Sequence, residues 1–199
     1  DLADLPGELA AHALDFRHAA SIERALGEAV AGWGRIDILI NNAAVGSATV
    51  TKYADDPAEQ DSAMLSINAD GTLKMCQAYL ALMQDNITDH PLKIINLSSV
   101  GGGVAAFPGF RLSDGMSKAA VALLTRQLAA ELTDQMIDVF AVCPGATNTG
   151  MFQASTLDPM TERQREEFLK SLPKRRLIEP REIADIIVFL ASGYSSPLH

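Results

Sequence analysis

Short apolar runs alternate with longer segments of helical periodicity along this 199-residue chain. The apolar runs are rich in Ile, Val and Leu at consecutive positions, which is typical of strands buried on both faces. We expect strands at 11–16, 36–44, 93–99 and 137–145, and helices at 18–34, 58–86, 114–135, 161–171 and 179–192. This alternation predicts a doubly wound α/β fold, with helices on both faces of a parallel sheet.

Composition favours one globular domain over residues 1–199. Hydrophobic residues make up 48% of the chain and charged residues 21%, and we find no internal repeat or low-complexity linker. No apolar run approaches the length of a membrane span, and no signal peptide opens the sequence. The formal net charge of −9 argues against a nucleic-acid surface, because phosphate binding needs clustered Lys and Arg.

The two cysteines, Cys76 and Cys143, lie in a helical pattern and at the end of an apolar run. Both are expected to be small buried residues of a reduced, cytoplasmic protein. Neither has a second Cys or a His at ligand spacing, so no metal site is expected.

Small, polar or turn-forming residues follow each predicted strand: Asp15, Asn41-Asn42-Ala43-Ala44, Ser98-Ser99 and Pro144-Gly145. In a sheet of this kind, ligands bind beyond the carboxyl ends of the strands. The amide of Asn41 can tie neighbouring strands, and Ala43 leaves room for a ligand to approach the backbone. The alternative is an ordinary asparagine turn.

Three further side chains stand where a purely structural residue would be unusual. Asn68 interrupts a helical, mostly apolar pattern, which predicts a kink with an exposed carbonyl and a bound water. Lys118 lies near a helix N-terminus, where a cation is unfavourable. Thr149 adds a hydroxyl to the turn after the last strand. Each has an ordinary alternative: a tolerated polar residue, a side chain that reaches solvent, or a Pro-Gly turn.

Taken in order, these motifs resemble the short-chain dehydrogenase/reductase family over essentially the whole chain. The resemblance matches Asp15 to an adenine-binding Asp, and residues 41–44 to an N-N-A-G motif with Ala in place of Gly. It matches Asn68 and Ser99 to the family's catalytic Asn and Ser. Residues 114–118 correspond to the Y-x-x-x-K motif, and residues 144–149 to P-G-x-x-x-T.

The resemblance implies a Rossmann-type fold and NAD(P)-dependent oxidoreduction of a small alcohol or ketone. It implies catalytic roles for Asn68, Ser99, Asp114 and Lys118, with the substrate carbonyl on Ser99 and a relay water on Asn68. It implies that NAD or NADP is held by Asp15, Asn41, Ala43, Lys118, Pro144, Gly145, Thr147 and Thr149. It also implies a homo-oligomer, a dimer or tetramer.

Two parts of the family pattern are absent from the sequence. The first is the T-G-x-x-x-G-x-G loop with the first two strands, and the second is the last strand. The glycine loop places a helix N-terminus at the cofactor pyrophosphate. We expect it to precede Asp1 in the complete polypeptide.

Asp114 stands where the family has its tyrosine acid/base, and no Tyr lies between residues 80 and 193. An ordinary Asp has a pKa of about 3.9, and a lysine four residues away lowers the pKa further. Asp114 is therefore expected to be ionised and to act only as an acceptor. Two readings remain open: an active oxidoreductase, or an impaired domain that binds cofactor or a partner chain within a larger protein.

Apolar residues also indicate contacts outside the core. The helices at 62–86 and 114–135 are apolar on more than one face, which favours a homo-oligomer; the residues concerned include Leu73, Met75, Leu80, Leu123, Leu124 and Leu128. Met151, Phe152, Met160 and Phe168 suit a lid over an apolar substrate, or else a surface helix that packs them into the core.

Overall fold

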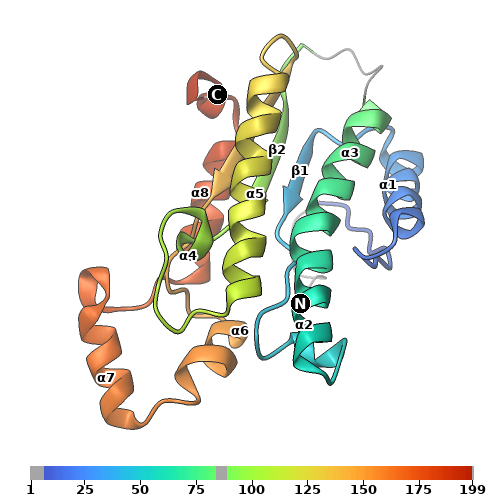
Figure 1. Cartoon of the computed structure of the whole chain (residues 1–199). Coiled ribbons are helices and arrows are strands. Elements are labelled where there is room, and N and C mark those ends of the chain that lie inside the picture. The colour runs from blue at the N-terminus through green and yellow to red at the C-terminus, as the bar shows by residue number, and fades with distance from the viewer. Residues whose placement is uncertain (1–6, 84–88, 199) are drawn as a thin grey trace.

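The computed structural model describes residues 7–83 and 89–198 and contains a three-stranded parallel sheet flanked by helices (Figure 1). The strands are β1 (Ile38–Asn41), β2 (Leu92–Leu97) and β3 (Ile137–Val142), in that order across the sheet. Asn41 lies opposite Asn96 in the register. The predicted parallel α/β fold is confirmed.

Helices connect the strands, as parallel pairing requires. They are α1 (Ala19–Trp33), α2 (Pro57–Leu65), α3 (Gly71–Met83), α4 (Val100–Gly103), α5 (Leu112–Glu131), α6 (Gly150–Phe152), α7 (Glu162–Ser171) and α8 (Pro180–Ala191). Shorter turns are η2 (Val50–Lys52), η3 (Ser66–Asp70), η4 (Gln153–Leu157), η5 (Pro173–Arg175) and η6 (Gly193–Leu198), of which η3 and η4 are π-helical. None of the helices in the described ranges is long and apolar enough to cross a membrane.

Helix ends follow their sequence signals. The Asp56 carboxylate accepts from the backbone nitrogens of Ala58 and Glu59 at 2.9 and 3.1 Å, and Pro57 opens α2. Gly34, with a φ of 82°, ends α1, because a left-handed residue at this position suits glycine. Asp56 and Gly34 thus define the start of α2 and the end of α1.

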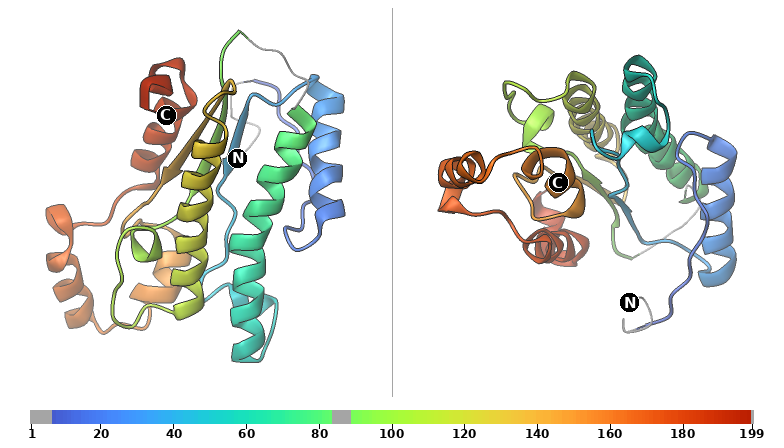
Figure 2. Two further views of the ribbon diagram at one scale, coloured as in Figure 1. Left: turned by 45° about the horizontal axis from the view of Figure 1, so that its top comes forward. Right: turned by 90° about the horizontal axis from the view of Figure 1, so that it is seen from below.

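Two apolar clusters cover the two faces of the sheet, and Figure 2 shows the helical layers that supply them. On one face, α1, α3 and α5 pack against Leu39, Ile94 and Val139. On the other, α8 packs through Leu190 against a cluster that includes Phe140. The carboxyl ends of the three strands are thereby fixed relative to one another.

Two strand predictions are wrong. Residues 11–16 form neither helix nor strand, because no strand within the described residues offers them backbone partners. β1 was expected to be buried on both faces, but only one face is buried: Ile38 and Ile40 are 41% and 44% exposed, while Leu39 is buried. β1 is also an edge strand, with β2 on one side only.

Candidate active site

The loops after β2 and β3 meet beyond the carboxyl end of the sheet. The backbone nitrogen of Val100 donates to the carbonyl oxygen of Pro144 at 2.9 Å. The glycines of α4 let this segment approach α5 closely: Gly102 has a φ of 88°, and a Cβ there would lie 2.1 Å from the carbonyl oxygen of Gly115. This contact places the residues after β2 against the first turns of α5.

Asn41 ends β1 and is buried. Its amide nitrogen donates to the side-chain oxygen of Asn96 at 2.8 Å and to the sulfur of Cys76 at 3.3 Å. Asn96 in turn donates to Thr125 on α5 at 3.0 Å. The predicted tie between neighbouring strands is confirmed, and the amide of Asn41 is occupied within the core.

Asn68 lies in the π-helical turn η3, so the helix irregularity predicted at this position is present. The predicted exposed carbonyl is wrong: Asn68 is 2% exposed, and its carbonyl oxygen accepts from the hydroxyl of Thr72 at 2.7 Å. Its side-chain amide exchanges two bonds with the backbone of Val45, at 2.8 and 2.9 Å, and donates to the hydroxyl of Ser117 at 3.2 Å. Asn68 therefore joins the loop after β1 to α5.

The two serines after β2 differ in their surroundings. Ser98 is buried and donates to the carbonyl oxygen of Lys118 at 2.7 Å. Ser99 is half-buried, and its hydroxyl accepts from the backbone nitrogen of Gly101 at 3.1 Å, which caps α4. The hydroxyl proton of Ser98 is already bonded to the backbone of α5, so Ser99 is the better placed of the two to donate to a ligand.

Lys118 and Asp114 lie one turn apart on α5. The ammonium of Lys118 donates to the carbonyl oxygen of Leu97, at the end of β2, at 3.2 Å. Burial lowers the pKa of Lys118, and the electrostatic influence of Asp114, the largest opposing contribution, raises it. The lysine therefore points toward the strand ends and not to solvent.

The expected depression of the Asp114 pKa is wrong. Burial raises the pKa of Asp114, and the positive charges of Lys118 and Arg111 only partly oppose this. Within the described ranges, no hydrogen bond or ion pair reaches its carboxylate. The desolvation cost therefore exceeds the attraction of the nearby lysine, and the carboxyl of Asp114 keeps its proton to a higher pH than an ordinary Asp does.

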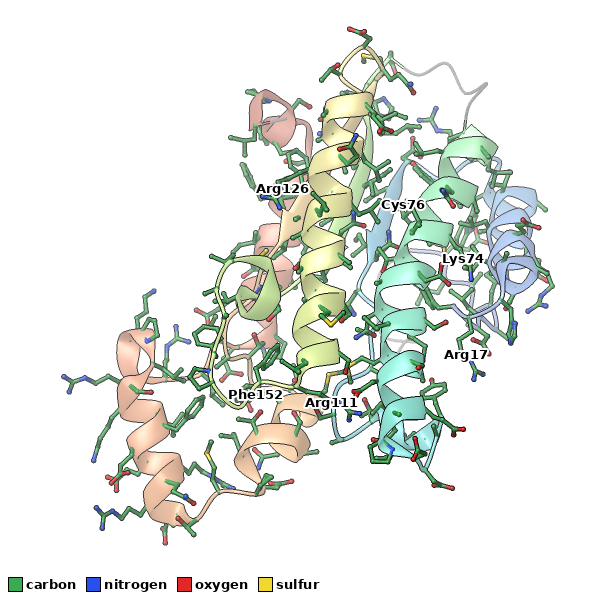
Figure 3. The ribbon with its side chains drawn as sticks, viewed as in Figure 1. Arg17, Lys74, Cys76, Arg111, Arg126 and Phe152 are labelled. Carbon is green, nitrogen blue, oxygen red and sulfur yellow. The ribbon has the colours of Figure 1, made fainter. Side chains whose placement is uncertain are left out.

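Asp15 follows a loop and not a strand, and its carboxylate is held by Arg17. The guanidinium donates at 2.7 and 3.0 Å, and the backbone nitrogen of Arg17 donates at 3.0 Å. These bonds lower the pKa of Asp15 to about 2. Arg17, which Figure 3 labels, also lies over the ring of Tyr53, with its guanidinium carbon 5.1 Å from the ring centroid.

The segment Pro144–Thr149 bonds largely to itself and to its neighbours. The hydroxyl of Thr147 donates to the carbonyl oxygen of Gly145 at 2.9 Å. The hydroxyl of Thr149 accepts from the backbone nitrogen of Phe152 at 3.2 Å and caps α6. Pro144 and Gly145 are half-buried at the end of β3.

A cavity of about 360 Å³ opens beside β1. Its lining includes Asn41, Asn42 and Ala43, which follow one another at the end of β1. Its apolar wall includes Phe16 and Met75. Phe16 was not predicted as a site residue, and no motif in the sequence singles it out.

The apolar residues expected in a lid lie on α6 and α7. The rings of Phe152 and Phe168 are 6.1 Å apart between centroids. Met151 lies against Gly46 after β1, where a Cβ would come within 2.8 Å of its sulfur. No residue of α7 is buried, so the alternative of a helix packed into the core does not hold for α7.

Three polar residues near Asp114 were missed by sequence reasoning. Arg111 and Ser113 bond to Asp61 on α2, and Ser117 bonds to the carbonyl oxygen of Asp114 at 2.8 Å. Ser113 and Ser117 flank Asp114 at helical spacing, which is a usable signal. The contact between residues 61 and 111 crosses 50 positions, and nothing in the sequence indicates it.

Comparisons with known proteins identify the family. A model described as enoyl-(acyl carrier protein) reductase matches residues 1–198. The oxidoreductase UcpA of Salmonella typhimurium is 36% identical over 189 residues, which cover 92% of this chain and 69% of that protein. The chain belongs to the short-chain dehydrogenase/reductase family.

Other members of the short-chain dehydrogenase/reductase family agree. The 3-oxoacyl-[acyl-carrier-protein] reductase FabG of Thermotoga maritima is 32% identical, over 96% of this chain and 73% of that protein. A crystal structure of 3-oxoacyl-[acyl-carrier protein] reductase from Brucella melitensis in complex with NAD superposes with a TM-score of 0.82 at 26% identity, over 96% of this chain and 73% of that one. Membership in the short-chain dehydrogenase/reductase family makes the chain an NAD(P)-dependent oxidoreductase by class.

Proposed function

We propose that the complete protein transfers hydride between NAD(P) and a small alcohol or ketone, with Asp114 in the proton-transfer role that the family gives to tyrosine. The observation that carries this proposal is the environment of Asp114. Its carboxyl group is desolvated, has a raised pKa, and is influenced by the charge of Lys118 one turn along α5. A catalytic acid needs a pKa nearer to the working pH than that of an exposed Asp.

Cofactor binding is supported by what lies at the strand ends. Ala43, which follows β1, is small and exposed, so a flat ring can approach the backbone there. We assign Asp15, Asn41, Ala43 and the segment 144–149 to the cofactor, with Asn41 acting through the strand that it fixes. The bound cofactor supplies or accepts the hydride. We assign none of the described residues to the pyrophosphate of the cofactor.

Lys118 has capacity left for a ligand. An ammonium has three donors, and one of them is bonded to the carbonyl oxygen of Leu97. We propose that the others hold ribose hydroxyls and that the positive charge stabilises the Asp114 carboxylate once its proton has left. Ser99 would donate a hydrogen bond to the substrate carbonyl oxygen.

Asn68 takes a different part from that of a side chain holding a water. Its amide protons are bonded to Val45 and Ser117. We propose that its contribution is to hold the turn of α5 that carries Asp114. A relay water on Asn68 stays a prediction.

The assay is NAD(P)H oxidation by the full-length protein against a panel of ketones, followed by absorbance. Asp114→Asn should abolish most turnover and leave cofactor affinity, measured by calorimetry, nearly unchanged. Arg126→Gln is the matched control, because Arg126 is an exposed residue on the same helix (Figure 3). Cofactor binding without turnover of any carbonyl in the parent protein would instead support the impaired binding domain.

We propose a homo-oligomer, but fewer of the apolar residues singled out in the sequence support it than expected. Met75 and Leu128 are buried within the protomer and give no support. Leu123 and Met116 on α5 are each 59% exposed, and Leu73 on α3 is 37% exposed. These side chains suit burial against a second copy in a dimer or tetramer.

A further inference from the structure

We propose that Asp61 on α2 is a positioning residue for Asp114, which it holds in place through Arg111 and Ser113 at the start of α5. The inference rests on the proposed proton-transfer role of Asp114 and deepens it. Asp61 is not a catalytic residue in this proposal, since it acts only through its two partners.

One carboxylate oxygen of Asp61 holds both partners. Nε of Arg111 donates to Oδ1 of Asp61 at 2.6 Å, and the hydroxyl of Ser113 donates to the same oxygen at 2.5 Å. Arg111 is the N-cap residue of α5, and Ser113 directly precedes Asp114. The two bonds therefore fix the backbone on the N-terminal side of Asp114.

The other nitrogens of Arg111 extend the contact along α2. Nη1 donates to the side-chain oxygen of Gln60 at 3.3 Å, and Nη2 donates to the carbonyl oxygen of Pro57 at 3.2 Å. Figure 3 shows Arg111 at the end of α5 that lies beside α2. A planar guanidinium bonded at all three nitrogens fixes both distance and orientation, which a lysine cannot do.

The C-terminal side of Asp114 is held from η3. Ser117 donates to the carbonyl oxygen of Asp114 and accepts from Asn68, which is bonded to Val45. The carboxylate of Asp114 lacks a bonded partner within the described residues, so its place depends on these two backbone anchors.

Stability is a poor explanation for the contact between Asp61 and Arg111. The side chain of Asp61 is 49% exposed, and ion pairs this open to solvent contribute little to folding. Ser113, in contrast, is buried, so its bond to Asp61 crosses from a core position to a surface carboxylate. That geometry favours control of helix position.

The charges around Asp114 make the proposal measurable. On α5, Lys118 and Arg111 both lower its pKa against the effect of burial. From the packed elements, α2 contributes Asp61 and the exposed Glu59, and Cys143 follows β3. The remaining charges are bonded to each other: Lys93 of β2 to Asp138 of β3 at 2.5 Å, and Asp70 of η3 to Lys74 of α3 at 2.6 Å. α4 has no titratable side chain.

The decisive variant is Asp61→Asn in the full-length protein, with Glu59→Gln as the control that removes an equal charge from the same helix. Carbon-detected NMR would follow the titration of the Asp114 carboxyl, and steady-state kinetics would give kcat and KM. We expect Asp61→Asn to shift that titration to lower pH, because Arg111 loses its neutralising partner. We expect kcat to fall by about tenfold to a hundredfold, as for a misplaced catalytic group, with the KM for cofactor changed less than twofold. Asp61→Glu should recover part of kcat.

An unchanged Asp114 titration and an unchanged kcat in Asp61→Asn, equal to those of Glu59→Gln, would overturn the proposal. If Asp61→Asn does not fold, Ser113→Ala removes one of the two anchors, and an unchanged titration and kcat there would overturn it equally. If the parent protein shows no turnover, the proposed function fails on its own. The NMR titration, which needs no activity, then still decides whether Asp61 positions Asp114.

Discussion

Asn41 lies directly opposite Asn96 in the register of β1 and β2, and its amide nitrogen donates to the side-chain oxygen of Asn96 at 2.8 Å. Asn96 is fully buried and also donates to Thr125, so the pair connects two strands to α5. Buried amides are stabilising only when each is bonded. The pair therefore holds the ends of β1 and β2 at a fixed spacing beside the proposed cofactor site.

Asn96→Ala should destabilise the full-length protein strongly, because it leaves Asn41 and Thr125 without this partner inside the core. Each buried group left unpaired costs about 1–3 kcal/mol. Urea unfolding measures the loss. Gln127→Ala on the exposed face of α5 should stay within about 0.5 kcal/mol of the parent, and an equal loss in both variants would contradict the role assigned to the pair.

Asp114→Asn should lower turnover by about 10²–10⁴-fold, the usual contribution of a general acid. Ketone reduction needs the protonated carboxyl of Asp114, whose pKa is raised by burial. The rate of ketone reduction should therefore fall as the pH rises through that pKa. Alcohol oxidation needs the ionised form and should rise over the same interval. A pH profile of kcat/KM in both directions checks this, and parallel profiles would contradict it.

Asp114→Tyr should raise ketone turnover if its ring reaches the substrate, since a phenol is the acid that the family pattern has at this position. Absorbance assays at saturating ketone compare the variant with the parent. A gain in turnover places residue 114 at the reacting atoms, whereas turnover below that of Asp114→Asn would show that the aspartate is specifically required.

The same residue should affect stability with a definite sign. Because the folded-state pKa of Asp114 is raised above its unfolded value, its stabilising contribution is fully present below the unfolded pKa and is lost as the pH rises through the folded pKa. The parent should therefore lose stability relative to Asp114→Asn as the pH rises over this range. Thermal unfolding of both proteins across the pH series measures the difference, and a parent that gains stability relative to Asp114→Asn with rising pH would contradict the assignment.

The two cysteines should differ in reactivity. Burial raises the pKa of Cys76 to about 12, and its side chain is fully buried, so iodoacetamide should not modify it in the folded protein. Cys143 is half-buried and directly precedes Pro144, so it should react and be protected by bound NAD(P)H. Mass spectrometry of the alkylated protein reads both sites. Modification of Cys143 at an unchanged rate with cofactor would argue against its place beside the binding site.

Leu123→Glu should dissociate the proposed oligomer, because it would bury a charge at the α5 contact. Sedimentation at micromolar concentration measures the assembly state. Ala31→Glu, which adds the same charge at an exposed position on α1, is the control for position. A monomeric parent protein would remove the proposal altogether.

Much of the fold was predictable, because helix periodicity and caps are local signals. Gly34 and Asp56 mark helix ends by backbone and side-chain chemistry that is visible in a few residues. The strand at 11–16 was wrong because pairing depends on a neighbour that an apolar pattern cannot supply. The prediction that β1 is buried on both faces was wrong for the same reason, because an apolar pattern does not show whether another element covers Ile38 and Ile40.

The location of the candidate site residues was predictable, but their electrostatics were not. Ser99, Asp114 and Lys118 lie at one end of the sheet, as the motif order indicated. The direction of the Asp114 pKa was wrong because sequence spacing reveals the attraction of Lys118 and conceals the desolvation. Arg111 and Asp61 were missed because their contact depends on how α2 and α5 pack.

The open side of β1 has a practical consequence for anyone who expresses this chain by itself. Within the described residues β1 pairs with β2 on one side only, and a short edge strand with Ile38 and Ile40 exposed to solvent is a template onto which another molecule's strand can add. The segment Ile38–Asn41 carries no lysine and no proline, the residues that commonly block such addition. Pairing of β1 with β1 of a second copy would use the open edge of both and close as a dimer, distinct from the assembly proposed at α5.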